Sequence, residues 1–385
     1  MTSSRFPSMT EEDYRASLRL IRTPRIGAVT YNRLITRYSS PQEALKAVPL
    51  LAKRGGGQAP KIASEKTVNE EIEQVKILGA RYIFRHTPYY PPLLDQLDNA
   101  PPVLLVKGNP RLLQKPAIAM VGARNASAAA CRFAHDLGQE LANKGYPVIS
   151  GLARGIDTAA HQGAGIEKTI AVIAGGLDSF YPPENKELQQ AISEKGLVVS
   201  EMPPKTEPKA RHFPARNRII AGIALGVLVV EASPKSGSLI TAKLATEIGR
   251  EVMAIPGFPM DARSQGCNQL IREGATLIQN SDQIIEAVSV MAALFEEPTE
   301  KSPLEPRFSG LENGQIGYRS SPAIAEVKAK DREIIQSLIG SASVGVNELI
   351  RQSGLENAII QTILLEMELA GRLESHAGGR VSLLF

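Results

Sequence analysis

The chain has 385 residues, of which 43% are hydrophobic and 22% are charged, and its formal net charge at pH 7 is +4. This length exceeds that of one ordinary core, so we expect two or three domains of a globular protein. The small net charge excludes a histone-like protein or a basic tail, and any functional positive charge must therefore be local.

The N-terminal part, residues 1–58, is predicted to form a small helical domain. Apolar residues recur at helical spacing from Glu11 to about Leu51, and Pro24 and Gly27 separate one helix from the next. Two short helices around a tight Ile-Gly turn are also typical of a helix-hairpin-helix, whose turn amides can hold a nucleic-acid phosphate. A plain helical domain with a glycine turn explains the pattern as well. The run R-G-G-G-Q at 54–58 is predicted to be a flexible connection.

Residues 59–295 are predicted to form a doubly wound, Rossmann-like α/β domain with a mostly parallel sheet. After a helix at 67–78 and a strand at 81–84, apolar strands and helices alternate in a regular order. Several strands are continuous apolar runs, as expected for parallel strands that are covered on both faces. The expected strands of this series lie at 117–121, 147–150, 169–174, 197–200, 227–231, 251–255 and 276–278.

The C-terminal part is predicted to contain a linker and a winged helix. Residues 296–324 are rich in proline, glycine, serine and charge, which is typical of a disordered linker. Residues 325–385 contain three amphipathic helical segments and then two strands around a glycine turn, which is the pattern of a winged-helix domain. Its third helix is apolar and acidic, with Glu366 and Glu368, so contact with a protein is as reasonable as contact with duplex DNA.

The most informative residues lie in four turns that carry cations. Parallel strands place such turns at one edge of the sheet, where ligands bind. Backbone amides, helix N-termini and guanidinium groups suit phosphate, so we expect these turns to converge on a groove for a long phosphate chain. The four turns are V-G-A-R at 121–124, S-G-L-A-R-G-I-D at 150–157, A-R-H-F-P-A-R-N-R-I-I-A-G at 210–222 and E-A-S-P-K-S-G-S at 231–238.

The same turns lack the patterns of cofactor binding and catalysis. Neither G-x-G-x-x-G nor G-x-x-x-x-G-K-[ST] is present, so NAD, FAD and ATP are not expected. His161 could pair with Asp157 four residues earlier, although a packed imidazole explains it as well. Asp157 is expected to accept from backbone amides or to neutralise an arginine, and Glu231 is expected to orient Arg216 or Arg218. We predict a binding protein with no catalytic residue, no cofactor and no metal.

An aromatic side chain at the edge of this groove bears on the type of nucleic acid. Phe213 lies just outside the helix that begins near Pro214. It could stack a base, or it could pack on its own helix as a hydrophobic staple, and both interpretations stay open. A groove on a sheet edge can follow one backbone but is too narrow for a duplex, so we favour single-stranded over double-stranded nucleic acid.

Six ordered motifs together closely resemble the DNA-processing protein A family (DprA, also called Smf). They are the V-G-A-R turn, S-G-L-A-R-G-I-D-T-A-A-H at 150–161, A-G-G-L-D-S-F-Y-P at 174–182, F-P-A-R-N-R-I-I-A-G at 213–222, V-V-E-A-S-P-K-S-G-S-L-I-T-A at 229–242 and G-C-N-Q-L-I-R-E-G-A at 266–275. The resemblance implies a single-stranded-DNA-binding protein of natural transformation that protects incoming strands and helps to load a RecA-type recombinase. It also implies a homodimer through the Rossmann-like domain and no cofactor requirement.

Carried over to this sequence, the resemblance implies a DNA-binding site in the four turns, to which we add the cation at position 211. The expected residues are Gly122, Arg124, Gly151, Arg154, Gly155, Arg211, Phe213, Arg216, Asn217, Arg218, Lys235, Ser236 and Gly237.

Two rival functions and the location of the protein complete the expectations. The loop at 236–242 superficially resembles that of Rossmann-like nucleotide hydrolases of the lysine-decarboxylase-like group, but the pattern P-G-G-x-G-T-x-x-E is missing. An adaptor acting through the winged helix is the other rival. The sequence starts without a signal-peptide pattern, has no apolar run near the roughly 20 residues of a membrane span, and has only two widely separated cysteines. We therefore expect a cytoplasmic protein without a membrane segment.

Overall fold

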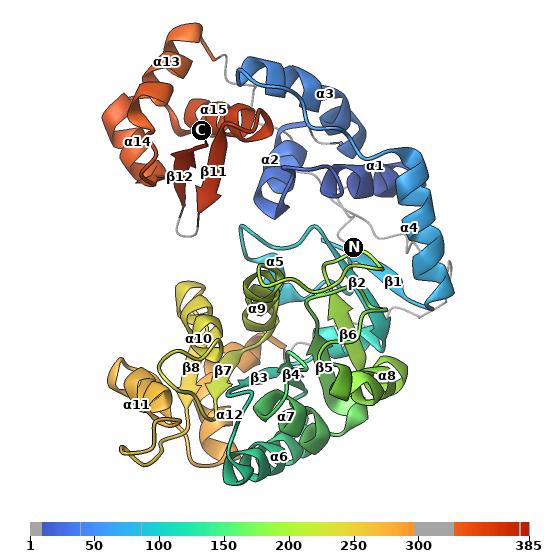
Figure 1. Cartoon of the computed structure of the whole chain (residues 1–385), viewed down its shortest axis with the longest axis vertical. Coiled ribbons are helices and arrows are strands. Elements are labelled where there is room, and N and C mark those ends of the chain that lie inside the picture. The colour runs from blue at the N-terminus through green and yellow to red at the C-terminus, as the bar shows by residue number, and fades with distance from the viewer. Residues whose placement is uncertain (1–9, 39, 86, 296–326, 377–378, 385) are drawn as a thin grey trace, which may run out of the picture. The chain divides into compact units, whose positions relative to one another are not determined.

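The computed structural model describes residues 10–38, 40–85, 87–295, 327–376 and 379–384 (Figure 1). These residues belong to two compact units. The larger unit is Glu71–Glu312, and the smaller unit joins Met1–Glu70 to Asn313–Phe385, so that both ends of the chain contribute to it. The predicted linker at 296–324 lies outside the described residues.

The larger unit is built on a sheet that has nine strands among the described residues. The strand order is β1-β2-β6-β5-β4-β3-β7-β8-β9, and all neighbours from β6 to β9 are parallel, whereas β1 and β2 form an antiparallel edge. The strands are β1 (Arg81–Phe84), β2 (Val103–Gly108), β3 (Ile118–Val121), β4 (Val148–Ser150), β5 (Thr169–Val172), β6 (Leu197–Ser200), β7 (Gly226–Val229), β8 (Glu251–Ala254) and β9 (Thr276–Leu277). The mostly parallel sheet and each of its eight predicted strands, including the one at 81–84, are confirmed, and β2 was not predicted.

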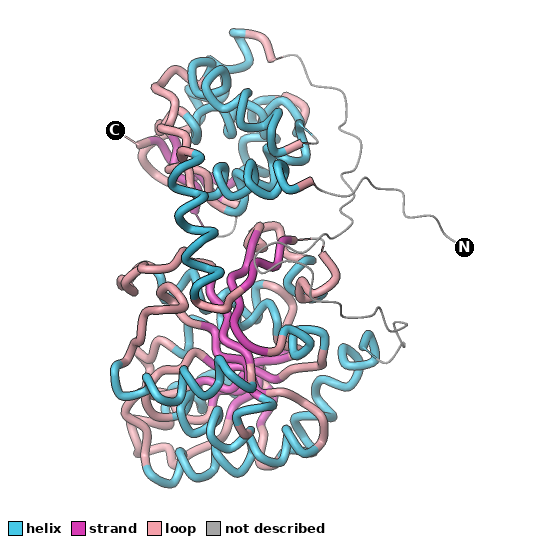
Figure 2. Tube along the Cα trace, turned by 90° about the vertical axis from the view of Figure 1, so that its right-hand side faces the viewer, coloured by secondary structure: helices cyan, strands magenta, loops and turns pink. Residues whose placement is uncertain are grey.

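Helices cover both faces of this sheet, as Figure 2 shows. Alternate residues of β3 point to opposite sides: Ala119 and Val121 belong to one core, whereas Ile118 and Met120 belong to the other. The first core includes residues of α9 (His212–Ile223), α10 (Ser238–Glu247) and α11 (Gln265–Arg272), and the second includes residues of α6 (Ala128–Asn143), α7 (Ile156–Ala164) and α12 (Ser281–Ala292). The doubly wound arrangement is therefore confirmed.

The order of the strands reverses at β3. The chain proceeds from β3 through β4 and β5 to β6 on one side, and then crosses to β7, β8 and β9 on the other. The helices that follow β3 and β7 consequently leave toward opposite faces, and a crevice opens between the carboxyl ends of these strands, which is where ligands bind in open α/β sheets. The remaining elements of this unit are α5 (Pro92–Asp95), α8 (Lys186–Lys195) and the short 3₁₀ helices η1 (Pro110–Gln114), η2 (Ile166–Lys168), η3 (Pro183–Asn185) and η4 (Ala293–Phe295).

The smaller unit contains a helical domain and a winged-helix domain, as predicted. The first has α1 (Glu11–Ile21), α2 (Ala28–Tyr38) and α3 (Pro41–Arg54), and α4 (Glu65–Ile77) leads toward the sheet. The second has α13 (Ala329–Leu338), α14 (Val346–Ser353), α15 (Asn357–Leu369) and a three-stranded sheet of order β10-β12-β11, formed by β10 (Val344–Gly345), β11 (Leu373–His376) and β12 (Arg380–Leu383). No helix within the described residues is long and apolar enough to cross a membrane.

The prediction of a flexible connection at 54–58 is wrong. The amide of Gly55 donates to Leu51 O at 2.9 Å and that of Gly57 donates to Ala52 O at 3.2 Å, so these glycines close the last turn of α3. They also lie against α15, because a β-carbon on Gly55 would be 2.0 Å from the carbonyl oxygen of Glu366. The glycines here permit close packing instead of flexibility.

Candidate nucleic-acid interface

The turns that follow β3 and β4 touch at the carboxyl edge of the sheet. Gly155 has a φ of 71°, and a β-carbon there would lie 2.3 Å from the carbonyl oxygen of Ala123. Gly122 meets the second turn from the other side, since its β-carbon would lie 2.5 Å from Cγ1 of Ile156. Both positions therefore require glycine, one for its left-handed backbone and both for the close approach of the two turns.

A cleft of about 950 Å³ opens at this edge, and a smaller recess of about 360 Å³ shares part of its wall. Arg124, Tyr181, Phe213 and Arg216 line both spaces. Of the thirteen predicted DNA-binding residues, nine line the cleft or the recess, namely Gly122, Arg124, Gly151, Arg154, Phe213, Arg216, Asn217, Ser236 and Gly237, whereas Gly155, Arg211, Arg218 and Lys235 line neither.

Arg216 forms the floor of the recess. Its side chain is buried, with 7% of the residue exposed, and its guanidinium group lies so close to Gly151 that a β-carbon there would be 1.2 Å from Nη1. Burial lowers the pKa of Arg216 to about 10, which leaves the group charged at pH 7. Its Nε atom has no hydrogen-bond acceptor among the described residues. A buried cation with an unused donor is costly unless a ligand completes it, and phosphate oxygens would do so.

Asp157 partly balances this buried charge. Its Oδ2 accepts hydrogen bonds from the amides of Gly151 at 3.0 Å and Ala153 at 3.3 Å, as predicted. Burial raises the pKa of Asp157, and the charge of Arg216 opposes this rise. Asp157 thus holds the second turn in shape, and no hydrogen bond joins it to His161 among the described residues.

Phe213 and Tyr181 form an aromatic platform in the wall of the cleft. Their ring centroids are 5.6 Å apart, and the guanidinium carbons of Arg124 and Arg216 lie 5.3 and 6.0 Å from the Phe213 centroid. Tyr181 is 47% exposed, so part of its ring is open to a ligand. Rings beside cations at an open cleft are suited to stacking bases, so this geometry favours the base-stacking interpretation of Phe213.

The remaining predicted cations have other partners or lie away from the cleft. Both carboxylate oxygens of Glu201 accept from Arg218 Nη2 at 2.6 Å, and the carbonyl oxygen of Asn99 accepts from Nη1 at 2.6 Å. Arg154 lines the recess but forms an exposed ion pair with Glu184. Arg211 and Lys235 are exposed at the ends of their turns.

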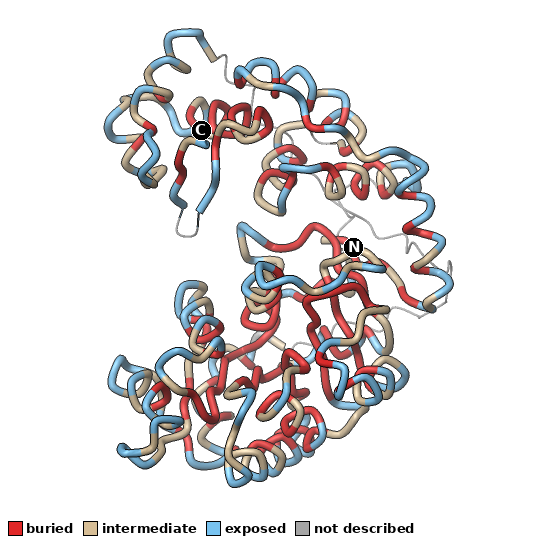
Figure 3. The backbone as a smooth tube through the Cα atoms, viewed as in Figure 1, coloured by how far each residue is buried: buried red, intermediate tan, exposed pale blue. Residues whose placement is uncertain are grey.

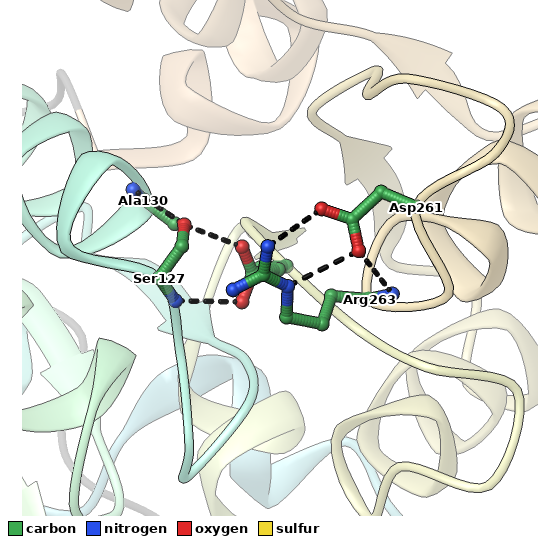
Figure 4. A network of polar contacts seen from close by, with 5 residues as sticks. Ser127, Ala130, Asp261 and Arg263 are labelled. Atoms are coloured by element: carbon green, nitrogen blue, oxygen red, sulfur yellow. Dashed lines mark hydrogen bonds and ion pairs between the residues drawn. The ribbon is translucent and has the colours of Figure 1, made fainter.

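The prediction that Glu231 orients Arg216 or Arg218 is wrong. Its carboxylate instead accepts from the amide of Ser127 at 3.0 Å and from the Ser127 hydroxyl at 2.7 Å, while the same hydroxyl caps α6 by accepting from Ala130 N at 3.1 Å. The positive N-terminus of α6 attracts this carboxylate at the end of β7. Figure 4 shows this network beside the ion pair of Arg263 with Asp261, whose closest distance is 2.8 Å.

His161 is a packed imidazole, as one of the two interpretations had it. Its Nδ1 is 2.7 Å from the Thr169 hydroxyl, and the residue is fully buried. Burial lowers the pKa of His161 to about 3, with a smaller contribution from Arg216, so the ring is neutral at pH 7. No cluster of three or more histidine, cysteine, aspartate or glutamate residues that could hold a metal occurs in the described part of the chain.

Sequence reasoning missed several residues that line the cleft or the recess, among them two polar or charged side chains and one aromatic side chain. Asn125, Tyr181 and Arg263 all line these spaces and were not among the predicted site residues. The motif A-G-G-L-D-S-F-Y-P contains Tyr181, and a search for aromatic residues beside the other motifs could have found it. Arg263 gave no signal, because it lies far along the chain in a loop after β8.

Another cavity, of about 620 Å³, lies between α1, α3 and α4. Both of its arginines are already engaged: Arg15 pairs with Glu11 at 2.7 Å, and Arg19 pairs with Glu65 at 3.0 Å. The volume is larger than that of the recess, but the cleft at the sheet edge is the better candidate because its buried arginine has an unused donor.

Comparison with known proteins identifies the family. Residues 81–289 match the family model described as DNA recombination-mediator protein A, residues 11–73 match the DprA-like N-terminal HHH domain, and residues 319–379 match the DprA winged helix domain. The chain belongs to the DprA family. This confirms the family that the six motifs indicated, and it joins the HHH domain, the sheet and the winged helix in one DprA architecture.

Individual DprA relatives are similar over different parts of the chain. A DNA processing protein DprA from Streptococcus pneumoniae is 48% identical over 198 residues, which are 51% of this chain and 70% of the relative. Protein Smf from Synechocystis is 30% identical over 378 residues, which are 92% of this chain and 95% of the relative. The solved structure of DprA from S. pneumoniae has a TM-score of 0.54 at 43% identity and covers 58% of this chain and 78% of that one. A structure of DprA from Helicobacter pylori, described for its single-stranded DNA binding mode, has a TM-score of 0.50 at 29% identity and covers 55% and 96%.

Proposed function

We propose that this DprA-family chain binds single-stranded DNA in the cleft at the carboxyl edge of its sheet. The observation that carries the proposal is the buried guanidinium group of Arg216, which lines the recess with an unused donor. Arg124 stands at the same wall with an exposed side chain, and the described residues offer it no hydrogen bond or ion pair. Two cations on one wall fit successive phosphates of a backbone.

The aromatic platform argues for a single strand. Bases of a duplex are stacked on each other and cannot reach a ring in a cleft, whereas an unpaired base can stack on Phe213 or Tyr181. A recess of about 360 Å³ is comparable to one nucleotide, not to a duplex. The relative from H. pylori is described as a single-stranded-DNA-binding protein, which supports this choice.

The most direct test compares the arginines of the cleft with a matched arginine at the opposite edge of the sheet. Arg111 is exposed on η1, next to β2, where Asn109 N donates to Gly196 O just before β6 begins. We expect Arg124→Ala and Arg216→Ala each to weaken binding of an oligothymidine about 10-fold or more. Each variant should also make the negative slope of log K against log salt shallower by about 0.7. Arg111→Ala should change neither. Equal effects in all three variants would contradict the proposed cleft.

We further propose the cellular role that the family suggests. The chain would protect incoming single strands in natural transformation, act in the cytoplasm as a homodimer through the Rossmann-like unit, and help to load a RecA-type recombinase. Nuclease protection of a labelled strand, light scattering of the pure protein and recombinase filament assembly on coated strands test these three roles separately. A monomer that still protects DNA would remove only the dimer from the proposal.

We propose a binding protein, not an enzyme. The rival, a nucleotide hydrolase, would have to use a carboxylate in the cleft, but Asp157, which lines it, accepts hydrogen bonds from the amides of Gly151 and Ala153. Incubation with nucleoside monophosphates should release no free base. Release that is lost in Asp157→Asn would overturn this part.

A further inference from the structure

The third helix of the winged helix, α15, is buried on two sides within the smaller unit. Ile363, Leu364 and Met367 belong to the core of the winged helix, whereas Leu365 and Leu369 pack in the core of helices α1–α3. Every residue from Thr362 to Met367 is buried, as the mostly red helix in Figure 3 shows. In DNA-binding winged helices this helix lies in the major groove, but here protein encloses it.

The helical domain meets α15 with a row of three arginines. Arg33 and Arg37 lie four residues apart on α2, and Arg25 lies in the turn before this helix, where its φ of 68° is not helical. Arg25 Nη1 donates to Leu369 O at 3.1 Å, Arg33 Nη1 lies 4.0 Å from Glu368 Oε2, and Arg37 Nη1 donates to Thr362 Oγ1 at 2.7 Å.

The groups of α15 that meet this row are all oxygens. One is a carbonyl at the negative end of the helix, one is a carboxylate and one is a hydroxyl. A nucleic-acid backbone offers the same kind of acceptor at every phosphate. The winged helix therefore meets the arginine row with hydrogen-bond acceptors, one of which is a carboxylate.

The close fit depends on two glycines at the end of α3. A β-carbon on Gly55 would lie 2.0 Å from Glu366 O, and one on Gly57 would lie 2.3 Å from Ala370 O. Gly55 has a φ of −73°, and Gly57 is not left-handed either, so their backbones would accept any side chain. The approach of α15 alone requires glycine at both positions.

We propose that the winged-helix domain caps a basic face of the N-terminal helical domain, formed by Arg25, Arg33 and Arg37, and that release of α15 opens this face to the phosphates of duplex DNA. Arg33 and Arg37 lie on one side of α2, and neighbouring cations on the outside of a helix suit the phosphates of a duplex backbone. This face is separate from the cleft of the proposed function.

The experiment uses the full chain with a wedge, which is a pair of larger side chains at the contact between α3 and α15. Gly55→Val with Gly57→Val places side chains where α15 packs, and Gly340→Ala is the control because a β-carbon there meets nothing within 4 Å. Hydrogen exchange of the α15 amides reports release, and anisotropy with a labelled 30-base-pair duplex reports binding. All proteins also carry Arg216→Ala, so that the cleft does not contribute.

We expect faster exchange in α15, about 10-fold tighter duplex binding and a slope of log K against log salt that is steeper by about 2 to 3. Removal of the three arginines from the wedge variant should abolish the gain. Three results would overturn the proposal: unchanged exchange, faster exchange without tighter binding, or a gain that survives loss of the arginines. None of them bears on the cleft, whose own test uses single strands.

Discussion

The guanidinium group of Arg216 occupies the space in which a side chain at Gly151 would stand, with Nη1 only 1.2 Å from the position of a β-carbon. Gly151, in the turn after β4, thus determines where the buried guanidinium group of Arg216 on α9 can lie. The two residues are 65 positions apart in the sequence and define the floor of the recess together.

Replacement of Gly151 by alanine should displace Arg216 without unfolding the domain, because the atom in the way is the end of a flexible side chain. We expect single-strand affinity to fall about 5- to 100-fold, which corresponds to a lost charge-assisted hydrogen bond of about 1 to 3 kcal/mol. Anisotropy titrations measure the affinity and thermal unfolding measures the stability. Normal affinity with an unchanged melting temperature would mean that Arg216 does not bind the strand.

Phe213→Ala should weaken binding of oligothymidine by about 1 to 3 kcal/mol if the ring stacks a base. Tyr181→Ala should act in the same direction. An abasic strand of equal length is the control, because it offers phosphates without bases, and the two variants should bind it as the unaltered chain does. Lower thermal stability with unchanged affinity would instead support the hydrophobic staple.

Arg218→Ala should act mainly on stability. The substitution removes the Nη2 donor that contacts both carboxylate oxygens of Glu201, whose side chain is 18% exposed. We expect the free energy of unfolding to fall by about 1 to 3 kcal/mol, and single-strand affinity to fall less than in Arg124→Ala. Denaturant titration and anisotropy on the same preparations give both values. A loss of affinity equal to that of Arg124→Ala would show that Arg218 leaves Glu201 to bind DNA.

The buried His161 should make stability depend on pH. Its pKa in the folded chain is about 3, below the ordinary 6.5, so folding favours the neutral ring. The stabilisation is complete above pH 6.5 and is lost as the pH falls from 6.5 toward 3, at about 1 kcal/mol per pH unit. His161→Gln should remove this slope, whereas the surface substitution His135→Gln should retain it. Denaturant unfolding between pH 7.5 and 4.5 measures the difference.

The strands from β3 to β7 were predictable because each is a short apolar run that is covered on both faces, as for Ile118–Val121. The last two strands, β8 and β9, are less buried. β2 was missed because its run follows a proline-rich tract and pairs antiparallel with β1, which the alternating order does not reveal. The glycines at 55–57 were wrongly predicted to be flexible, because a sequence does not distinguish a glycine in a flexible segment from one that permits close packing of another helix.

Part of the cleft was predictable from the order of the strands. Turns after parallel strands meet at one edge, so Gly122, Arg124 and Gly151 could be placed together without coordinates. The partners of long charged side chains could not be placed, since Arg218 reaches Glu201 and Glu231 reaches Ser127 through contacts that only the packed chain defines. That the cleft residues bind DNA stays a prediction.

Because α3 packs against α15, the N-terminal helical domain depends on the C-terminal part of the chain to cover its core. A form truncated before Val327 would leave in water the leucine-bearing side of α3 against which Leu365 and Leu369 pack, together with the arginines of α2. Such truncated forms should be less soluble and should adsorb to polyanions, and supplying residues 327–385 as a separate polypeptide should rescue them. A chain that contains the helical domain and the sheet domain but lacks the winged helix would then expose a surface that the complete chain covers.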